Sequence, residues 1–205
     1  MGDEAEEPTS FGRWISRPQS LIALAALLMS ICGLFVALYE ASLVRRQQRA
    51  SVWPYVEVAA SLTRERVEVR VRNTGVGPAR IEAAAVTRDG EVLKGWADLI
   101  ATTAADSEES EYYYSLIHGS VLRRDSEAVV IFRVTSDQES VSADLVPTLA
   151  KEMLAGRADV TVCYCSVFDE CWVSSLRGVF RSSSDGEAAG ERAVESCEGA
   201  PRSRI

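Results

Sequence analysis

The longest run of apolar positions lies near the amino terminus, at residues 21–39, and it contains no charged residue. As an α-helix this run would extend roughly 28 Å, about the thickness of the hydrocarbon core of a bilayer. A cleaved signal peptide would have a basic start and a shorter run, whereas this run follows an acidic segment and ends in bulky residues. A helix buried in a soluble protein would need a large surrounding core, and the remaining chain is short and mostly strand-like. The pattern therefore favours a retained transmembrane helix over residues 21–39.

The segments on either side of this run are polar. Residues 1–20 are acidic and contain two prolines, which predicts a disordered head. Residues 40–52 are good helix formers without a helix breaker, so the helix is expected to continue as a juxtamembrane stalk that ends before Pro54. Cationic and aromatic side chains of the stalk are expected at the membrane interface, namely those of Arg45, Arg46, Arg49 and Trp53.

From Tyr55 onward the apolar positions recur with a period of two. Residues 55–62 and 67–71 alternate in this way, which is typical of half-buried strands joined by a hairpin at residues 63–65. Asp89-Gly90 predicts the turn of a second hairpin. The same reasoning predicts strands at 129–134, 157–168 and 171–180, and short helices at 96–102 and 148–154, the latter with Ser142 or Asp144 as its N-cap.

About seven short strands separated by turn signals favour an antiparallel, immunoglobulin-like β-sandwich with one short inserted helix. The Cys…Trp…Cys spacing of antibody domains is absent from the sequence, so the resemblance is one of architecture. The predicted fold is a single transmembrane helix followed by this mainly-β domain at residues 53–181. Residues 182–205 are rich in Ser, Gly, Glu and Ala, which predicts a disordered tail.

The segment NTGVGPA, residues 73–79, connects two predicted strands. Asn73, Gly75 and Gly77 permit positive φ, and Pro78 stops ladder pairing, so the segment is predicted to be a shaped structural loop. A phosphate-binding loop would need a Lys followed by Ser or Thr at a fixed spacing, then a helix. Neither follows here, so phosphate binding is not expected.

Composition restricts the partners more than it defines a reaction. The 205-residue chain carries a net charge of −8, and a nucleic-acid partner is excluded because no basic excess is present to displace counterions. The single histidine, His118, lies beside Gly119, and its position in the sequence identifies no nucleophile or acid that could form a catalytic triad with it. The sequence also contains neither a nucleophile elbow nor a metal-binding motif. We therefore expect no catalytic residues, no cofactor, no metal and no enzyme activity.

Three of the five cysteines lie close together, at Cys163, Cys165 and Cys171. Residues two apart in a strand share a face, and a turn over residues 167–169 would place Cys165 opposite Cys171. Three interpretations stay open: small buried side chains, a Cys165–Cys171 or Cys163–Cys171 disulfide, or a redox or metal site. Three thiolates lack the fourth ligand of a structural zinc site. Cys32, in the span, and Cys197, in the tail, are expected to be inert.

Several blocks follow one another in a distinctive order. They are the apolar span, a basic RRQQRASVWPY stalk, the NTGVGPA loop and the motif C-Y-C-S-x-x-x-E-C-W. In these blocks, over roughly residues 21–180, the chain resembles a group of uncharacterised bacterial small single-pass membrane proteins. The loop after its strand also resembles, more weakly, those of extracellular β-sandwich adhesion modules. The first resemblance implies a bacterial inner (plasma) membrane and carries no activity.

Positive charges near the span do not decide its orientation, because three lie on each side when the terminal amine is counted. The even number of cysteines in the soluble part suits an oxidising compartment, so we expect the domain outside the cytoplasm. The expected function is a non-enzymatic, membrane-anchored β-sandwich that binds a protein partner or itself, with the lipid bilayer as its other contact. The alternative is a thiol-based redox or metal-responsive protein that uses Cys163, Cys165 and Cys171.

Overall fold

The structure, a computed structural model, describes residues 18–104, 110–125, 127–137, 141, 143–176 and 191–205. The chain divides into two units, residues 1–48 and 49–205. The predicted head, the acidic residues 106–109, Ser142 and residues 182–190 lie wholly or mostly outside the described residues.

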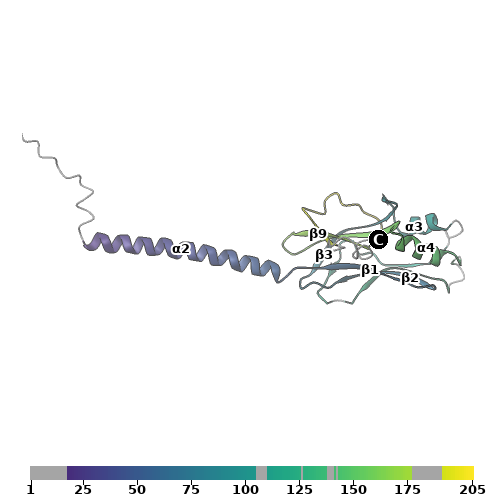
Figure 1. The fold of residues 1–205 in the computed structure, drawn as a ribbon, viewed down its shortest axis with the longest axis horizontal. Coiled ribbons are helices and arrows are strands. Elements are labelled where there is room, and N and C mark those ends of the chain that lie inside the picture. Colours follow the sequence, from purple (N-terminus) through teal and green to yellow (C-terminus); the bar gives the residue numbers. More distant parts are fainter. Residues whose placement is uncertain (1–17, 105–109, 126, 138–140, 142, 177–190) are drawn as a thin grey trace, which may run out of the picture. The chain divides into compact units, whose positions relative to one another are not determined.

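Helix α2 (Pro18–Ala50) contains the whole apolar run and continues into the predicted stalk (Figure 1). It is the one helix of the described residues that is long and apolar enough to cross a membrane. Its large apolar side chains are exposed around the helix, among them Ile22, Met29 and Phe35. A helix that is apolar on every side and uncovered by protein is typical of a membrane span.

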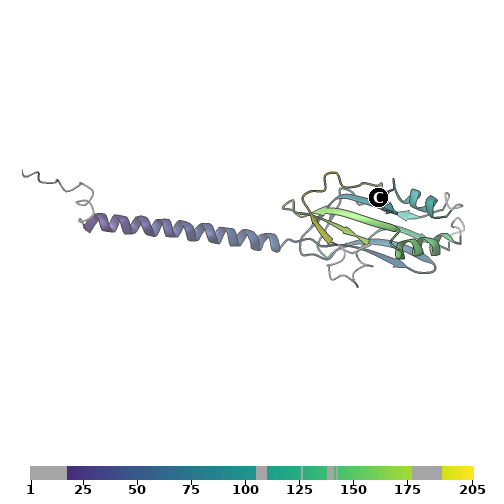
Figure 2. The ribbon, with the colours of Figure 1, turned by 45° about the horizontal axis from the view of Figure 1, so that its top comes forward.

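The second unit contains two antiparallel sheets (Figure 1, Figure 2). The first has the strand order β1 (Val56–Leu62), β2 (Arg66–Asn73), β7 (Val129–Thr135), β5 (Tyr113–Tyr114). The second has the order β10 (Glu191–Val194), β9 (Cys171–Ser175), β8 (Ala158–Cys165), β3 (Ala79–Arg88), β4 (Glu91–Val92), and β6 (Val121–Leu122) also pairs with β3. The predicted mainly-β domain with antiparallel sheets is thus present.

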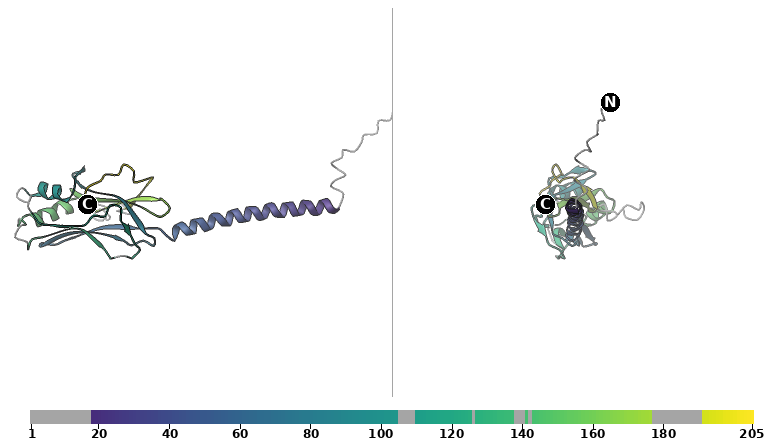
Figure 3. Two further views of the ribbon diagram at one scale, coloured as in Figure 1. Left: turned by 180° about the vertical axis from the view of Figure 1, so that it is seen from behind. Right: turned by 90° about the vertical axis from the view of Figure 1, so that its left-hand side faces the viewer.

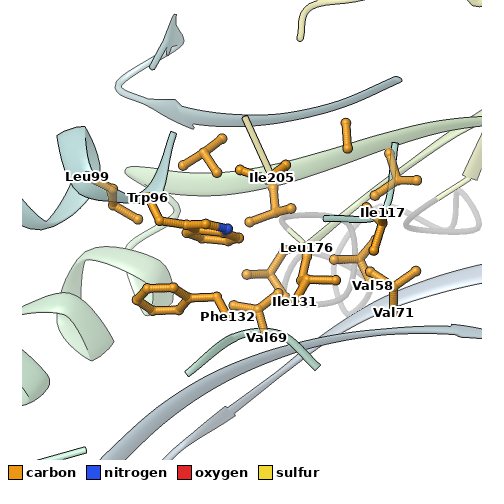
Figure 4. Packing of buried hydrophobic residues seen from close by; sticks show 14 of the residues in the cluster. Val58, Val69, Val71, Trp96, Leu99, Ile117, Ile131, Phe132, Leu176 and Ile205 are labelled. Atoms are coloured by element: carbon orange, nitrogen blue, oxygen red, sulfur yellow. The ribbon is translucent and has the colours of Figure 1, made fainter. Parts of the chain in front are cut away.

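The two sheets lie in layers, which Figure 3 shows from behind, and their facing side chains form the core (Figure 4). The period-two pattern explains this arrangement, because Val67, Val69 and Val71 of β2 are all fully buried while Arg72 is exposed. Trp96 stacks on Phe132 with their ring centroids 4.4 Å apart, and so extends the core to helix α3 (Trp96–Thr103).

Two short helices lie at one end of this unit (Figure 1). α3 (Trp96–Thr103) and α4 (Leu145–Leu154) occur close to their predicted positions, although α4 begins three residues earlier than expected. Asp144 takes the predicted N-cap position of α4, but its side chain makes no capping hydrogen bond within the described residues. Hydrophobic burial rather than capping therefore holds α4, since Leu145, Leu149 and Met153 are buried.

A buried carboxylate fixes the pairing of β2 with β7. Glu68 is opposite Arg133 in the register and its side chain is fully buried. Arg70 donates a hydrogen bond to it, as does Arg133 at 2.5 Å. Burial raises the pKa of Glu68, but the hydrogen bonds from Arg70 and Arg133 outweigh it, so this pKa lies below its ordinary value.

The prediction of a disordered tail is wrong for residues 191–205. Strand β10 pairs antiparallel with β9, and Ile205 is 1% exposed. Ser203 fixes the segment between them, because its hydroxyl donates to the Leu93 carbonyl at 2.5 Å and accepts from the Val86 N–H at 3.0 Å. The segment has few apolar residues, which is why disorder was predicted. An edge strand is held by backbone pairing as well as by apolar side chains, so polar composition alone does not exclude a strand.

Candidate functional site

The predicted structural loop is organised by Asn73, whose side chain is fully buried. Its Oδ1 accepts hydrogen bonds from the backbone N–H groups of Gly75 at 3.0 Å and Tyr55 at 3.3 Å. Its Nδ2 donates to the carbonyls of Gly77 at 2.7 Å and Leu122 at 3.0 Å. All of these partners are backbone groups, so Asn73 shapes the loop and does not present chemistry to a ligand.

The reason given above for the two glycines of this loop is wrong. Neither Gly75 nor Gly77 is among the described residues with positive φ. A Cβ on Gly75 would instead lie 2.2 Å from the Tyr55 nitrogen, and one on Gly77 would lie 1.8 Å from the Val52 carbonyl oxygen. Glycine is needed because the chain that leaves α2 passes directly against the loop.

The residues predicted for the membrane interface fall into two groups. Arg45 and Arg46 are exposed on α2, and their contact with lipid headgroups stays a prediction. Arg49 pairs with Glu170 at 3.2 Å, and Trp53 stacks on Trp172 with ring centroids 5.6 Å apart. Trp53 therefore packs on the β domain, although half of its surface remains exposed.

The predicted cysteine cluster contains two disulfides, and it includes Cys197, which the sequence did not predict. Cys165 is opposite Cys171 in the register of β8 and β9, and these two residues form one bridge. Cys163 bonds to Cys197 rather than to Cys171, so the expectation that Cys197 is inert is wrong. The even number of cysteines in the soluble part was the available signal, because four cysteines permit two bridges. Cys32 is free and exposed on α2.

The two bridges lie side by side, with the sulfur atoms of Cys165 and Cys197 3.7 Å apart. The sulfurs of Cys165, Cys171 and Cys197 all lie within 4.8 Å of one another. If both bridges were reduced, Cys163 would add a fourth thiolate, which completes the ligand number of a structural zinc site. In the disulfide-bonded form none of these sulfur atoms is a thiolate, so the cluster acts as a pair of structural cross-links.

A pocket of about 630 Å³ lies beside α3, a size common among ligand-binding pockets. Its walls come from three separate parts of the chain, residues 94–98, residues within 112–118 and residues 202–205. The C-terminal segment is held in place by backbone contacts: the Arg204 N–H donates to the Lys94 carbonyl at 2.8 Å, and Arg204 forms a parallel bridge with Gly95. Gly95 permits this approach, because a Cβ there would lie 3.2 Å from the Arg204 carbonyl oxygen.

The inner part of the pocket carries an unusual donor. Trp96 is 2% exposed, and its indole Nε1 is buried without a hydrogen-bond partner in the described residues. Figure 4 shows this nitrogen on the side of the ring that faces Ile205, another residue of the pocket wall. A buried indole N–H normally has a partner, so an acceptor that reached this nitrogen would satisfy it.

The rim of the pocket is positively charged. Lys94, Arg202 and Arg204 are exposed, and none of them forms a side-chain ion pair in the described part of the chain. The carboxylate of Asp98 accepts a hydrogen bond from the Lys94 backbone N–H at 3.0 Å. Burial, and then the nearby Tyr114 and Asp98, raise the pKa of Tyr112, so its hydroxyl is neutral at physiological pH.

His118 lines the same pocket and is exposed. Within the described residues it makes no hydrogen bond to an acid, a hydroxyl or a thiol, which an imidazole base would need for orientation. The other residues of the pocket were not predicted from the sequence, because no local pattern indicates that three distant segments meet. The pocket offers stacking surfaces, donors and positive charge, which are features of binding.

Comparisons with known protein families, with curated proteins and with solved structures found no match to this chain. The pocket and the two disulfides are therefore interpreted from their own geometry. Of the two, the pocket beside α3 is the stronger candidate for ligand contact: the four bridged cysteines are each at most 6% exposed, and Cys163 lines a smaller pocket of about 340 Å³.

Proposed function

We propose that the protein is a non-enzymatic binding module, in which one transmembrane helix anchors an immunoglobulin-like β-sandwich outside the cytoplasm of a bacterial cell. The observation that carries this proposal is the pocket beside α3, which combines aromatic walls with a cationic rim. The partner is a protein that inserts a side chain or a short segment there. Aromatic and arginine side chains are the residues most enriched at such contacts.

The sandwich assignment is supported by the two antiparallel sheets and the core between them. The location is supported by the two disulfides, because bridges persist in oxidising compartments and are rare in the cytosol. Every cysteine of the β unit is bridged, and the single free one lies on α2.

The binding proposal can be tested with a photo-reactive amino acid placed at Leu116 of the full-length protein in cells. Leu116 lines the pocket and is 65% exposed. Val121 lies outside the pocket wall and is 56% exposed, which makes it a matched control. We expect a discrete cross-linked protein from position 116 and none from position 121. Equal cross-linking from both positions, or none from either, would contradict the proposal.

The anchor and its orientation need a separate test. Arg123 is exposed, so Arg123→Cys supplies one accessible thiol on the β unit. A membrane-impermeant maleimide should label this variant in intact cells, and the protein should stay in the membrane fraction after alkaline carbonate. Labelling that requires cell lysis would place the domain in the cytoplasm.

A thiol-based redox role is the second candidate, favoured by the 3.7 Å separation between sulfurs of the two bridges. It predicts that a mild dithiol reductant opens both bridges in the folded protein, or that the reduced protein binds zinc with one ion per chain. The binding module predicts instead that the thiols become available on unfolding.

A further inference from the structure

We propose that the pocket recognises an acidic peptide segment that carries an aromatic side chain. This inference rests on the proposed binding function and specifies the chemistry of its ligand. Three features of the pocket support it: the apolar floor, the sign of the charge, and an unpaired hydrogen-bond donor.

The floor suits a flat apolar group. Trp96, Tyr112 and Ile205 contribute to it, and Leu116 extends it to the surface. Trp96 is held rigidly by its stack on Phe132, and Tyr112 lies with its ring centroid 5.8 Å from that of Phe132. An aromatic side chain can therefore dock against fixed ring surfaces, which lowers the entropy cost of binding.

The rim selects the sign of the ligand charge. Three cationic side chains, those of Lys94, Arg202 and Arg204, line the pocket, and Asp98 is the one acidic side chain among its lining residues. The chain as a whole has a net charge of −8, so this local excess of positive charge is opposite in sign to the rest of the molecule. Such a rim attracts acidic groups and repels basic ones.

The hydrogen-bonding groups point to the same ligand. The N-cap residue of α3 is Gly95, which contributes no capping side chain, and its parallel bridge with Arg204 brings the start of the helix against residues 202–205. The indole N–H of Trp96 is a buried donor without a partner among the described residues. Donors and cations together prefer a carboxylate to a neutral or cationic group.

Three peptides test this inference on the full-length protein in a zwitterionic detergent. The probe is acetyl-Glu-Phe-Glu-amide, and the matched controls are acetyl-Gln-Phe-Gln-amide, which lacks the charge, and acetyl-Glu-Ala-Glu-amide, which lacks the ring. The affinity of each unlabelled peptide is measured by isothermal titration calorimetry at low salt. We expect each control to bind about tenfold more weakly than the probe.

The site is tested with the triple variant Lys94→Gln, Arg202→Gln, Arg204→Gln. Glutamine keeps the backbone hydrogen bond between residues 94 and 204, so the fold of the pocket wall is retained. The control is Arg64→Gln, an exposed arginine in the β1–β2 turn that lies outside the pocket. We expect the triple variant to bind the probe about tenfold more weakly and the control variant to bind it unchanged.

The outcomes separate this inference from the proposed function. Equal binding of the charged and uncharged peptides, or an unchanged affinity in the triple variant, would overturn the acidic ligand class. An equal loss in Arg64→Gln would show general charge attraction and would overturn it as well. Cross-linking from Leu116 in cells without probe binding would leave the binding module standing and remove the ligand class alone.

Discussion

Replacing Gly77 with alanine tests the loop that Asn73 organises. A Cβ at this position would lie 1.8 Å from the Val52 carbonyl oxygen and 2.3 Å from the carbonyl carbon. Separations under 3.0 Å are essentially never seen for a real Cβ, so the two backbone segments must move apart by about 1.2 Å. The obstacle is backbone, so no side-chain rotation can relieve it.

The cost follows from the contacts that this movement breaks. The Trp53 carbonyl accepts hydrogen bonds from the N–H groups of Val76 at 2.9 Å and Gly77 at 3.1 Å, each worth about 1 kcal/mol. Displacing Trp53 also weakens its stack on Trp172, which is worth about 1 kcal/mol. We therefore expect Gly77→Ala to lower the free energy of unfolding by about 3 kcal/mol.

Urea unfolding of the full-length protein in detergent, followed by tryptophan fluorescence, measures this loss. At a slope of about 2 kcal/mol per molar urea, the midpoint should fall by about 1.5 M. Gly119→Ala is the control, because Gly119 has a φ of +74° and open space around its Cβ position. That variant should lose about 1 kcal/mol through backbone strain alone. A midpoint for Gly77→Ala equal to or above that of Gly119→Ala would refute the close approach.

Three further outcomes are expected. Because Arg70 and Arg133 lower the pKa of Glu68, the stability that the ionised carboxylate contributes is present above the ordinary pKa of 4.5 and is lost as the pH falls. The urea midpoints of wild type and Glu68→Gln should therefore differ at pH 7 and converge in acid. A difference that stays constant with pH would contradict this. Cys197→Ser opens a bridge with a sequence separation of 34 and should cost about 4 kcal/mol, whereas Cys171→Ser opens one with a separation of 6 and should cost about 2 kcal/mol; equal losses by urea unfolding would refute the chain-entropy reasoning. In Cys171→Ser the freed Cys165 thiol lies 3.7 Å from the Cys197 sulfur, so peptide mapping should recover a Cys165–Cys197 bond, and its absence would show that exchange is blocked.

Local patterns predicted the local parts of the fold. Asp89 and Gly90 both have positive φ in the observed hairpin turn, as an Asp-Gly pair between alternating strands indicates. The pairing of Cys165 with Cys171 could be predicted for the same reason, because the turn fixes the register of a hairpin.

The parts that the sequence did not predict depend on contacts between distant segments. Residues 191–205 are mostly polar, yet three of them are held by distant elements. Val194 pairs with β9, Cys197 is bonded to Cys163 of β8, and Ile205 belongs to the same buried core as Trp96 of α3. The pocket exists because residues 202–205 reach the start of α3, and no periodicity within either segment indicates that meeting. Gly77 was singled out for the wrong reason, since a close backbone approach cannot be distinguished from positive φ in a sequence.

The unequal spans of the two bridges have a consequence for the order of oxidation during biosynthesis. Cys165 and Cys171 are brought together by one hairpin, so their bond can form as soon as that hairpin has formed. The Cys163–Cys197 bond can form only after the last strand has docked. Until then Cys163 is a free thiol next to the Cys165–Cys171 bond and can exchange with it. The maturation rate of the protein should therefore depend on a thiol–disulfide isomerase, and a cell without one should accumulate a mispaired form that lacks the final strand.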